Sequence, residues 1–339
     1  MTWQEEAINL RDEDKTYPEI AEILGAKYGE AFHPEQIRGA CRRRGATEKI
    51  KKSRVTFEDR KTVTQADVEA YIEAMIALQE AEKAIDTRQV TATIDLDESK
   101  PVGIAHSGDW HVGSKGTDYR LFQQDLGLML DTPGLYIVGQ GDYKDNYIAG
   151  TPTGGATGQV VQPEQQDEVV LYFMRRLKER LLALLRGCHD HWSKKQGDTD
   201  FVAQCAKEAN AVNFWHGGTL TLKLGAQSYK EHVRHRLRFE SSLNTTNAMR
   251  RMFEFYGEAD IAAGAHLHNP EVNERHLQGG YRIMLRCGSY KVWDDHGQQF
   301  GYGKGRPGVP LVILFPREHR MIAHRDLRTG IEHLKALRG

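Results

Sequence analysis

The feature that most constrains this chain of 339 residues is a series of five short blocks rich in histidine and aspartate. The blocks are Asp109-Trp110-His111, Gly141-Asp142-Tyr143-Lys144-Asp145-Asn146, Gly187-Cys188-His189-Asp190-His191, His235 and Gly264-Ala265-His266-Leu267-His268. Short apolar runs such as 135–138 and 181–185 lead into these blocks, and a helical pattern spans about 164–180. Strands that alternate with helices and carry polar side chains at their carboxyl ends predict an α/β fold.

Two of the blocks contain pairs of metal-ligand side chains two residues apart. On an extended segment such side chains point to the same side, so Asp109 and His111 can serve one site, as can His266 and His268. A carboxylate between two cations can bridge them, and Asp142 is placed for that role. Imidazole and carboxylate ligands favour Mn²⁺, Fe²⁺, Zn²⁺ or Ni²⁺ over Ca²⁺. Two such ions can clamp a phosphoryl group and activate a water between them.

The order of the blocks resembles the signature of the calcineurin-like metallophosphoesterases over roughly residues 100–290. The resemblance implies a four-layer α/β/β/α sandwich, within the α/β class, that hydrolyses phosphoric esters. Within that superfamily the chain is similar to the DNA-repair exonuclease branch and its phage-encoded relatives. We therefore expect two divalent metal ions as cofactors, Mn²⁺ in the first place, with Zn²⁺, Fe²⁺ or Ni²⁺ as alternatives.

The resemblance also implies a role for each matching residue. The ligands of a first metal would be Asp109, His111, Asp142 and His268. The ligands of a second would be Asp142, Cys188, His235 and His266. His189 would protonate the leaving oxygen, and Asp190 would orient it. His232 competes with His235, which is preferred because Ser241, Ser242 and Asn244 follow it, as in phage-type relatives.

Two positions depart from the family pattern. Cys188 stands where the family has an asparagine, and a thiolate is a softer ligand than an amide oxygen. Three outcomes follow from that change: ligation of Zn²⁺ or Fe²⁺, a protonated thiol with water in its place, or a weakened second site. The last block has one extra residue, Ala265, after its glycine, but it keeps the histidine pair.

The sequence before the five blocks predicts two further segments. Residues 1–54 form a small all-α module that resembles a helix-turn-helix, with a capping box at Thr16 and Glu19 and a further helix start near His33. Residues 55–99 predict a helical linker or brace, with a helix over 64–86 whose apolar face carries Val68, Ile72, Met75 and Ile76, and then an alternating strand. The resemblance implies that residues 100–339 form the metallophosphoesterase domain.

Basic residues gather at two places and are candidates for binding nucleic acid. They are Arg38, Arg42, Arg43, Arg44, Lys51, Lys52, Lys304 and Arg306. The alternative for the first group is a solvated helix end, and for the second a turn-rich connector. A formal net charge of −1 gives no global basic field, so any nucleic-acid partner must meet a local patch.

Three classes of function remain open. A nuclease, acting on DNA in the first place, is favoured by the basic module, by the glycine-rich loop at 150–158 and by 301–306. A phosphatase of protein or small-molecule esters is the second, and a non-catalytic DNA-binding relative is the third. The four scattered cysteines and the lack of a membrane-length apolar run or leader predict a cytoplasmic protein without a membrane partner. Homo-oligomerisation stays open.

Overall fold

The computed structural model describes the chain in two compact units, Met1–Ala81 and Glu82–Gly339. The described residues are 2–43, 63–85, 90–148, 151, 158–197, 200–238, 240–241, 243–277, 280–293, 298–299, 301 and 304–339. Most of the loop at 150–158 lies outside these ranges. The predicted domain boundaries at 54 and 99 stay predictions.

The first unit begins with three helices, α1 (Trp3–Asp12), α2 (Tyr17–Tyr28) and α3 (Pro34–Arg43). The capping box predicted at Thr16 and Glu19 is confirmed, and Thr2 and Glu5 form another at the start of α1. The three helices bury a small core of their own, made of Ala7, Ile20, Ala21, Leu24, Ile37 and Cys41. The likeness to a helix-turn-helix module stays a prediction.

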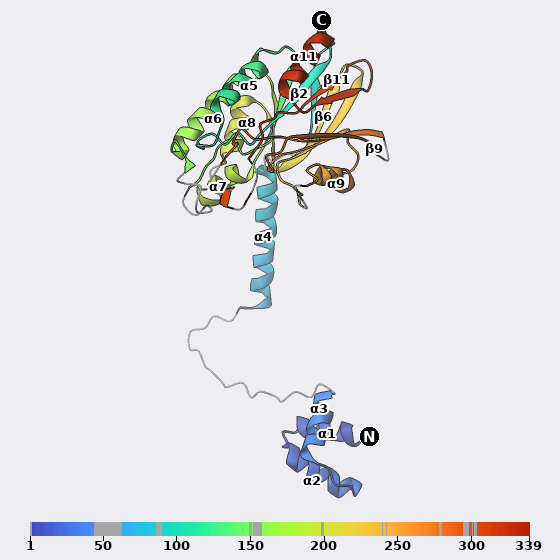
Figure 1. The fold of residues 1–339 in the computed structure, drawn as a ribbon. Helices are drawn as coiled ribbons and strands as arrows, with labels where there is room; N and C mark the ends of the chain where they lie inside the picture. Colours follow the sequence, from blue (N-terminus) through green and yellow to red (C-terminus); the bar gives the residue numbers. More distant parts are fainter. Residues whose placement is uncertain are drawn as a thin grey trace. The chain divides into compact units, whose positions relative to one another are not determined.

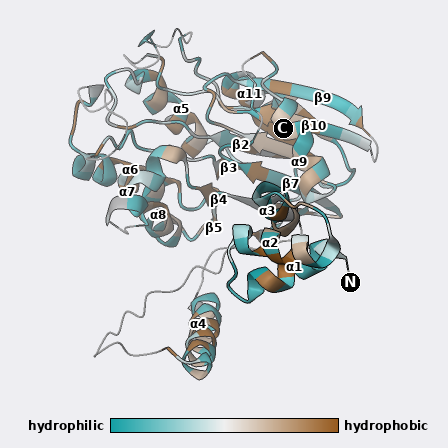
Figure 2. Ribbon diagram, turned by 90° about the horizontal axis from the view of Figure 1, so that it is seen from below, coloured by the Kyte–Doolittle hydropathy of each residue, from teal (hydrophilic) through white to brown (hydrophobic). Residues whose placement is uncertain are grey.

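A long helix, α4 (Gln65–Ile85), follows in the chain. Figure 2 shows hydrophobic and hydrophilic residues alternating along it, as its sequence predicts. Its apolar side chains are nevertheless exposed: Val68 is 47% exposed and Met75 is 41% exposed.

The second unit is built on two six-stranded sheets. The first has the order β12-β11-β2-β3-β4-β5, from β2 (Val102–Ser107), β3 (Leu135–Gly139), β4 (Leu181–Leu185), β5 (Val212–Trp215), β11 (Leu311–Leu314) and β12 (Met321–His324). The second has the order β1-β6-β7-β8-β10-β9, from β1 (Thr91–Leu96), β6 (Gly217–Leu224), β7 (Gln227–Arg234), β8 (Ile261–Gly264), β9 (Glu271–Leu277) and β10 (Gly280–Arg286).

Three apolar cores separate four layers, so the predicted α/β/β/α sandwich is confirmed. The helices α5 (Tyr119–Asp131), α6 (Pro163–Leu177), α8 (Phe201–Ala209) and α11 (Leu327–Arg338) share a core with the first sheet. The two sheets share the second core, to which alternate residues of β6 contribute Leu220, Leu222 and Leu224. The helix α9 (Asn247–Tyr256) covers the outer face of the second sheet, on the side opposite to α5 and α6 (Figure 1).

The strand directions bring the five blocks to the same end of the sandwich. In the first sheet β2, β3 and β4 are parallel, and in the second β7 is parallel to β8. Each block follows the carboxyl end of one of these five strands. Among the described residues, no helix combines the length and apolar character that a membrane crossing requires.

Candidate metal centre

The blocks place their histidine, aspartate and cysteine side chains in one cluster. Four groups of three residues have ligand atoms that all lie within 4.8 Å of one another. They are Asp109, His111 and His268; Asp109, Asp142 and His235; Cys188, His235 and His266; and His111, Asp142 and His189. The groups share members, so the seven residues predicted as metal ligands form one connected set.

Several of these residues have a backbone conformation that is rare outside glycine. The φ angles are 48° at Asp109, 46° at His111, 53° at Asp142, 74° at His266 and 56° at His268. A non-glycine residue in this left-handed region costs free energy and persists where its surroundings hold it in place. Hydrogen bonds between the turns supply that support, because the Asp109 amide donates to the Gly141 carbonyl and the His266 amide donates to Asp109 Oδ2.

One part of the cluster, which we call the first donor group, consists of Asp109, His111 and His268. Nε2 of His111 lies 3.2 Å from Nε2 of His268, and Asp109 Oδ1 lies 3.5 Å from the latter. His111 Nδ1 lies 3.2 Å from Asp145 Oδ1, which also accepts a hydrogen bond of 2.9 Å from Lys291 Nζ. A proton on Nδ1 bound to that carboxylate leaves the Nε2 lone pair of His111 facing the group.

The second donor group consists of Cys188, His235 and His266, with Asp142 beside it. His235 Nδ1 donates a hydrogen bond of 2.7 Å to the Gln140 carbonyl, so its Nε2 faces Asp142 Oδ2 at 3.2 Å. Cys188 Sγ lies 3.8 Å from His266 Nδ1. Cys188 therefore lies beside the two histidines with which the resemblance groups it. The competing histidine, His232, instead bonds Thr219 and the Gly257 carbonyl.

The donor set fits divalent cations. Asp109 Oδ1 and His235 Nε2 are buried and make no hydrogen bond of good geometry, although His268 Nε2 lies 3.5 Å from the first and Asp142 Oδ2 lies 3.2 Å from the second. A buried polar atom of this kind costs about 1–3 kcal/mol unless something binds it. Burial lowers the pKa of His111 to about 4 and that of His266 to about 3, so these two imidazoles are neutral at pH 7, as metal ligands must be. Burial also acts to lower the pKa of His235, but the charge of Asp142 outweighs it and raises that pKa well above its usual value. Burial acts to raise the pKa of Asp142, but the neighbouring charges of His235 and His189 outweigh it and hold that pKa well below its usual value.

The predicted proton donor, His189, lies on α7 (Cys188–Gly197) at the edge of the cluster. Its Nδ1 is 2.5 Å from the Asp145 carbonyl, and its backbone amide donates to Asp142 Oδ1. Its ring centroid is 4.0 Å from that of Trp192 and 5.3 Å from that of Tyr147. These contacts fix the orientation of the ring.

Asp190 has a different role from the one that the resemblance implies. Instead of orienting His189, its oxygens accept hydrogen bonds from the backbone amides of Asp142, Tyr143 and Gly187. The first turn of α7 directs the carboxylate back onto the β3 corner, and the Asp145 carbonyl takes its place beside His189. Burial, followed by the charge of Asp142, raises the pKa of Asp190 to about 7.

The candidate nucleic-acid residues fall in both units of the chain. Arg38 is on α3, where it pairs with Glu35 at 2.9 Å, and Arg42 is exposed on the same helix. Arg43 ends α3, but its side chain lies outside the described residues, as do Arg44, Lys51 and Lys52. Lys304 and Arg306 are exposed in the second unit. The Arg306 backbone amide donates to the His268 carbonyl, which places that segment beside the first donor group.

Comparisons with known proteins give weak likenesses. No protein-family model matches the chain, and no curated protein does. Among solved structures it is similar to zinc-complexed Vps29 from Entamoeba histolytica, at 14% identity over 66% of this chain and 98% of that one, with a TM-score of 0.35. A Streptococcus pneumoniae TIGR4 protein described as a predicted phosphoesterase has 14% identity, the same coverages and a TM-score of 0.31.

A third similar structure is a serine/threonine phosphatase from Saccharomyces cerevisiae with similarity to human phosphatase PP5. It has 11% identity over 76% of this chain and 89% of that one, with a TM-score of 0.35. These likenesses are too weak to assign an activity, which has to rest on the geometry of the site.

Proposed function

We propose that this chain is a metal-dependent phosphodiesterase that hydrolyses nucleic acid, DNA in the first place. The observation that carries the proposal is the connected set of donor groups, in which two buried ligand atoms, Asp109 Oδ1 and His235 Nε2, make no hydrogen bond. The first donor group together with Asp142 would hold one Mn²⁺ or similar ion, and the second donor group with Asp142 would hold another. When bound, such ions supply Lewis-acid activation of water and of the phosphoryl group.

The chain's own contribution to the chemistry centres on His189. Because its Nδ1–H donates to the Asp145 carbonyl, Nε2 is the atom left to exchange a proton with the leaving oxygen. Burial lowers the pKa of His189, which makes a proton held at Nε2 easier to transfer. Trp192 and Tyr147 flank the ring and restrict its rotation. The Asp145 carboxylate also accepts a hydrogen bond from Lys291 and contacts His111 Nδ1. Asp145 therefore orients both a proposed metal ligand and the proposed proton donor.

The arginine-bearing α3 of the first unit supports nucleic acid as the substrate class. Its described arginines, Arg38 and Arg42, precede the basic run of Arg43, Arg44, Lys51 and Lys52 in the sequence. Such a row of cations binds phosphate backbones without reading sequence. A phosphatase of small molecules has no need of a docking element of this kind.

The test is cleavage of labelled single- and double-stranded DNA by the full chain with Mn²⁺, beside the variants His189→Ala and His276→Ala. We expect the wild-type chain to cleave DNA and EDTA to abolish that cleavage. The His189→Ala variant should cleave about 10²–10⁴-fold more slowly and should still retain its bound metal. His276 is an exposed histidine of β9 and serves as the matched control, for which we expect no change.

Two results would contradict the proposal. Hydrolysis of an aryl phosphate monoester without any cleavage of DNA would make the chain a phosphatase. Binding of DNA without turnover of either substrate would make it a non-catalytic relative, in which Cys188 has weakened the second metal site.

A further inference from the structure

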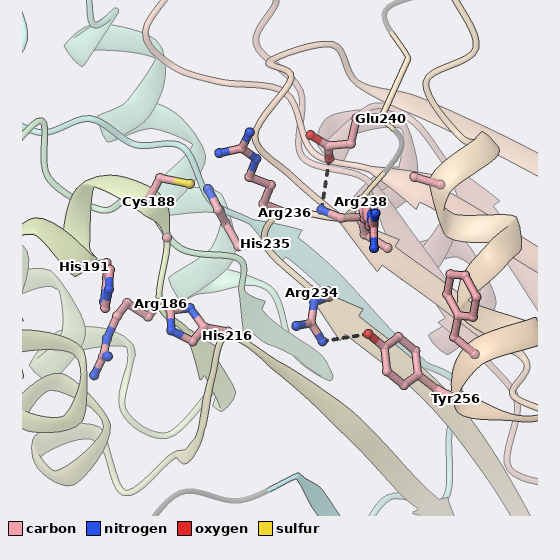
Figure 3. Close-up of a pocket in the computed structure, with 14 residues that line it drawn as sticks. Arg186, Cys188, His191, His216, Arg234, His235, Arg236, Arg238, Glu240 and Tyr256 are labelled. Atoms are coloured by element: carbon pink, nitrogen blue, oxygen red, sulfur yellow. Dashed lines mark hydrogen bonds between the residues drawn. The ribbon is translucent and has the colours of Figure 1, made fainter. Parts of the chain in front are cut away.

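A cavity of about 750 Å³ opens beside the second donor group, and Cys188 and His235 form part of its lining (Figure 3). Four arginines also line it: Arg186, Arg234, Arg236 and Arg238. The lining has one carboxylate, that of Glu240. This concentration of cations, in a chain whose formal net charge is −1, is the local basic surface that a polyanion requires.

Three of the arginines come from the segment that also supplies the ligand His235. Arg234 ends β7, and Arg236 and Arg238 follow at alternate positions, both exposed. The residues between them are buried, His235 in the metal centre and Leu237 in the core beneath α9. Exposure therefore alternates along 234–238, with the three arginines more exposed than the two residues between them.

The ion pairs of Glu240 and Arg186 leave the lining of the cavity with a net positive charge. Glu240 accepts a hydrogen bond of 3.0 Å from Arg286 Nη1, so its charge is already matched by an arginine outside the lining. Arg186 pairs with Asp200, and its guanidinium lies 4.3 Å from the centre of the Trp215 ring. Nη1 of Arg186 is buried without a hydrogen-bond partner.

Aromatic side chains form another part of the lining, at the end of α9. Phe255 is 61% exposed and Tyr256 is 47% exposed. Arg234 Nη1 donates a hydrogen bond of 2.9 Å to the Tyr256 hydroxyl, an interaction visible in Figure 3. Exposed aromatic faces beside a row of cations are the combination with which proteins bind unpaired nucleotides, stacking the bases and neutralising the phosphates.

We propose that this cavity binds the single-stranded part of a polynucleotide next to the phosphate that is cleaved. Arg234, Arg236 and Arg238 contact successive phosphates, and Phe255 and Tyr256 stack against a base. The inference rests on the proposed function and deepens it, because it names an unpaired strand as the substrate. A phosphate monoester could use the cations nearest the metals but not a row that continues to an aromatic surface.

The test combines binding and kinetics on the full chain, with the double variant Arg236→Gln/Arg238→Gln. The probes are a labelled oligothymidylate, bis-p-nitrophenyl phosphate and inorganic phosphate. We expect the variant to raise KM for the oligonucleotide about tenfold, with kcat changed little, and to lower kcat/KM for the oligonucleotide relative to the small diester. We also expect the slope of log K against log salt for oligonucleotide binding to fall by about 0.7 for each phosphate that the variant no longer neutralises.

Two further variants sharpen the result. Tyr256→Ala should weaken oligonucleotide binding about tenfold without changing the salt slope, because it removes a stacking surface and no charge. Arg317→Gln is the matched control, since Arg317 is exposed between β11 and β12 and is not part of the lining. It should leave every measured quantity at the wild-type value.

The outcomes separate this inference from the proposed function. If the wild-type chain hydrolyses neither ester but the double variant still loses oligonucleotide affinity and salt slope, the proposed function fails and the strand site stands. If hydrolysis occurs and the double variant keeps the wild-type KM and salt slope, the inference is overturned. It is also overturned if inhibition by inorganic phosphate weakens as much as oligonucleotide binding, because the arginines would then form a monoester site.

Discussion

The two donor groups of the metal centre differ in what surrounds them. In the first, His111 is held by the Asp145 carboxylate, which Lys291 also binds. In the second, His235 is held by a neutral backbone carbonyl, that of Gln140, and the group forms part of the wall of the arginine-lined cavity. A carboxylate behind a histidine makes the imidazole a stronger ligand than a carbonyl does. We therefore propose that the first donor group retains a metal and that the second meets the substrate.

The largest expected effect comes from removing Asp142, whose carboxylate lies within 4.8 Å of ligand atoms from both donor groups. Asp142→Ala takes away the carboxylate that lies 3.2 Å from His235 and belongs to two of the four ligand sets. We expect both metal ions to be lost and cleavage of DNA to fall to the metal-free background. Metal content by mass spectrometry after gel filtration checks this, and a variant that keeps two bound ions would contradict the bridging role.

The next largest effect distinguishes the two donor groups, because the substitution lowers the metal affinity of the first group alone. Asp145→Ala removes the carboxylate behind His111, and losses of this kind lower metal affinity by about 10–100-fold. Calorimetric titration with Mn²⁺ should show weaker binding at one of two sites. Glu332→Gln, at an exposed position of α11, is the control. Equal weakening of both sites would remove the distinction between the groups.

A smaller effect addresses the second group alone. Cys188→Asn replaces a soft sulfur by a hard amide oxygen at the position 3.8 Å from His266. We expect the affinity of this site to shift toward Mn²⁺ relative to Zn²⁺, while the other site is unchanged. Competition between the two metals, measured by calorimetry, gives the ratio. An unchanged ratio would show that the Cys188 sulfur does not contact the metal.

The smallest effect concerns His106, a buried residue of β2 that lies 3.2 Å from Glu231. Burial lowers the pKa of His106 to about 3, so between that value and the ordinary value of 6.5 only the unfolded chain takes up its proton. Stability is therefore lost as pH falls through this window, by up to about 1.4 kcal/mol per pH unit for one group.

His106→Gln should make the free energy of unfolding less dependent on pH between about 3 and 6.5. Urea unfolding in EDTA measures this without interference from metal binding. An identical pH dependence in wild type and variant would show that His106 titrates normally in the folded chain.

Much of the site follows from local sequence, because each block is a corner at the end of a strand. Asp109, Asp142 and His235 could be placed on one edge from strand direction alone, and the structure brings them together. The partners of those residues depend on tertiary contacts. Lys291 reaches Asp145 across 146 positions, and no local pattern announces it.

The arginines near His235 and the side chain of Asp190 differ in how far the sequence predicts them. The alternation of Arg234, Arg236 and Arg238 around the predicted ligand His235 is visible in the sequence and indicates a basic surface beside that residue. The orientation of Asp190 is not visible in the sequence, because it depends on how the first turn of α7 packs against the β3 corner. The left-handed conformations at Asp109 and His111 are likewise set by hydrogen bonds to the β3 corner.

The measurement that tests the central claim most directly is the rate of cleavage of a labelled single-stranded DNA as Mn²⁺ is added stepwise to the metal-free chain. If two ions act at the connected donor groups, cleavage stays near background through the first equivalent, rises with the second and then levels off. Absence of cleavage at two or more equivalents, or full cleavage at one, would contradict a two-metal phosphodiesterase.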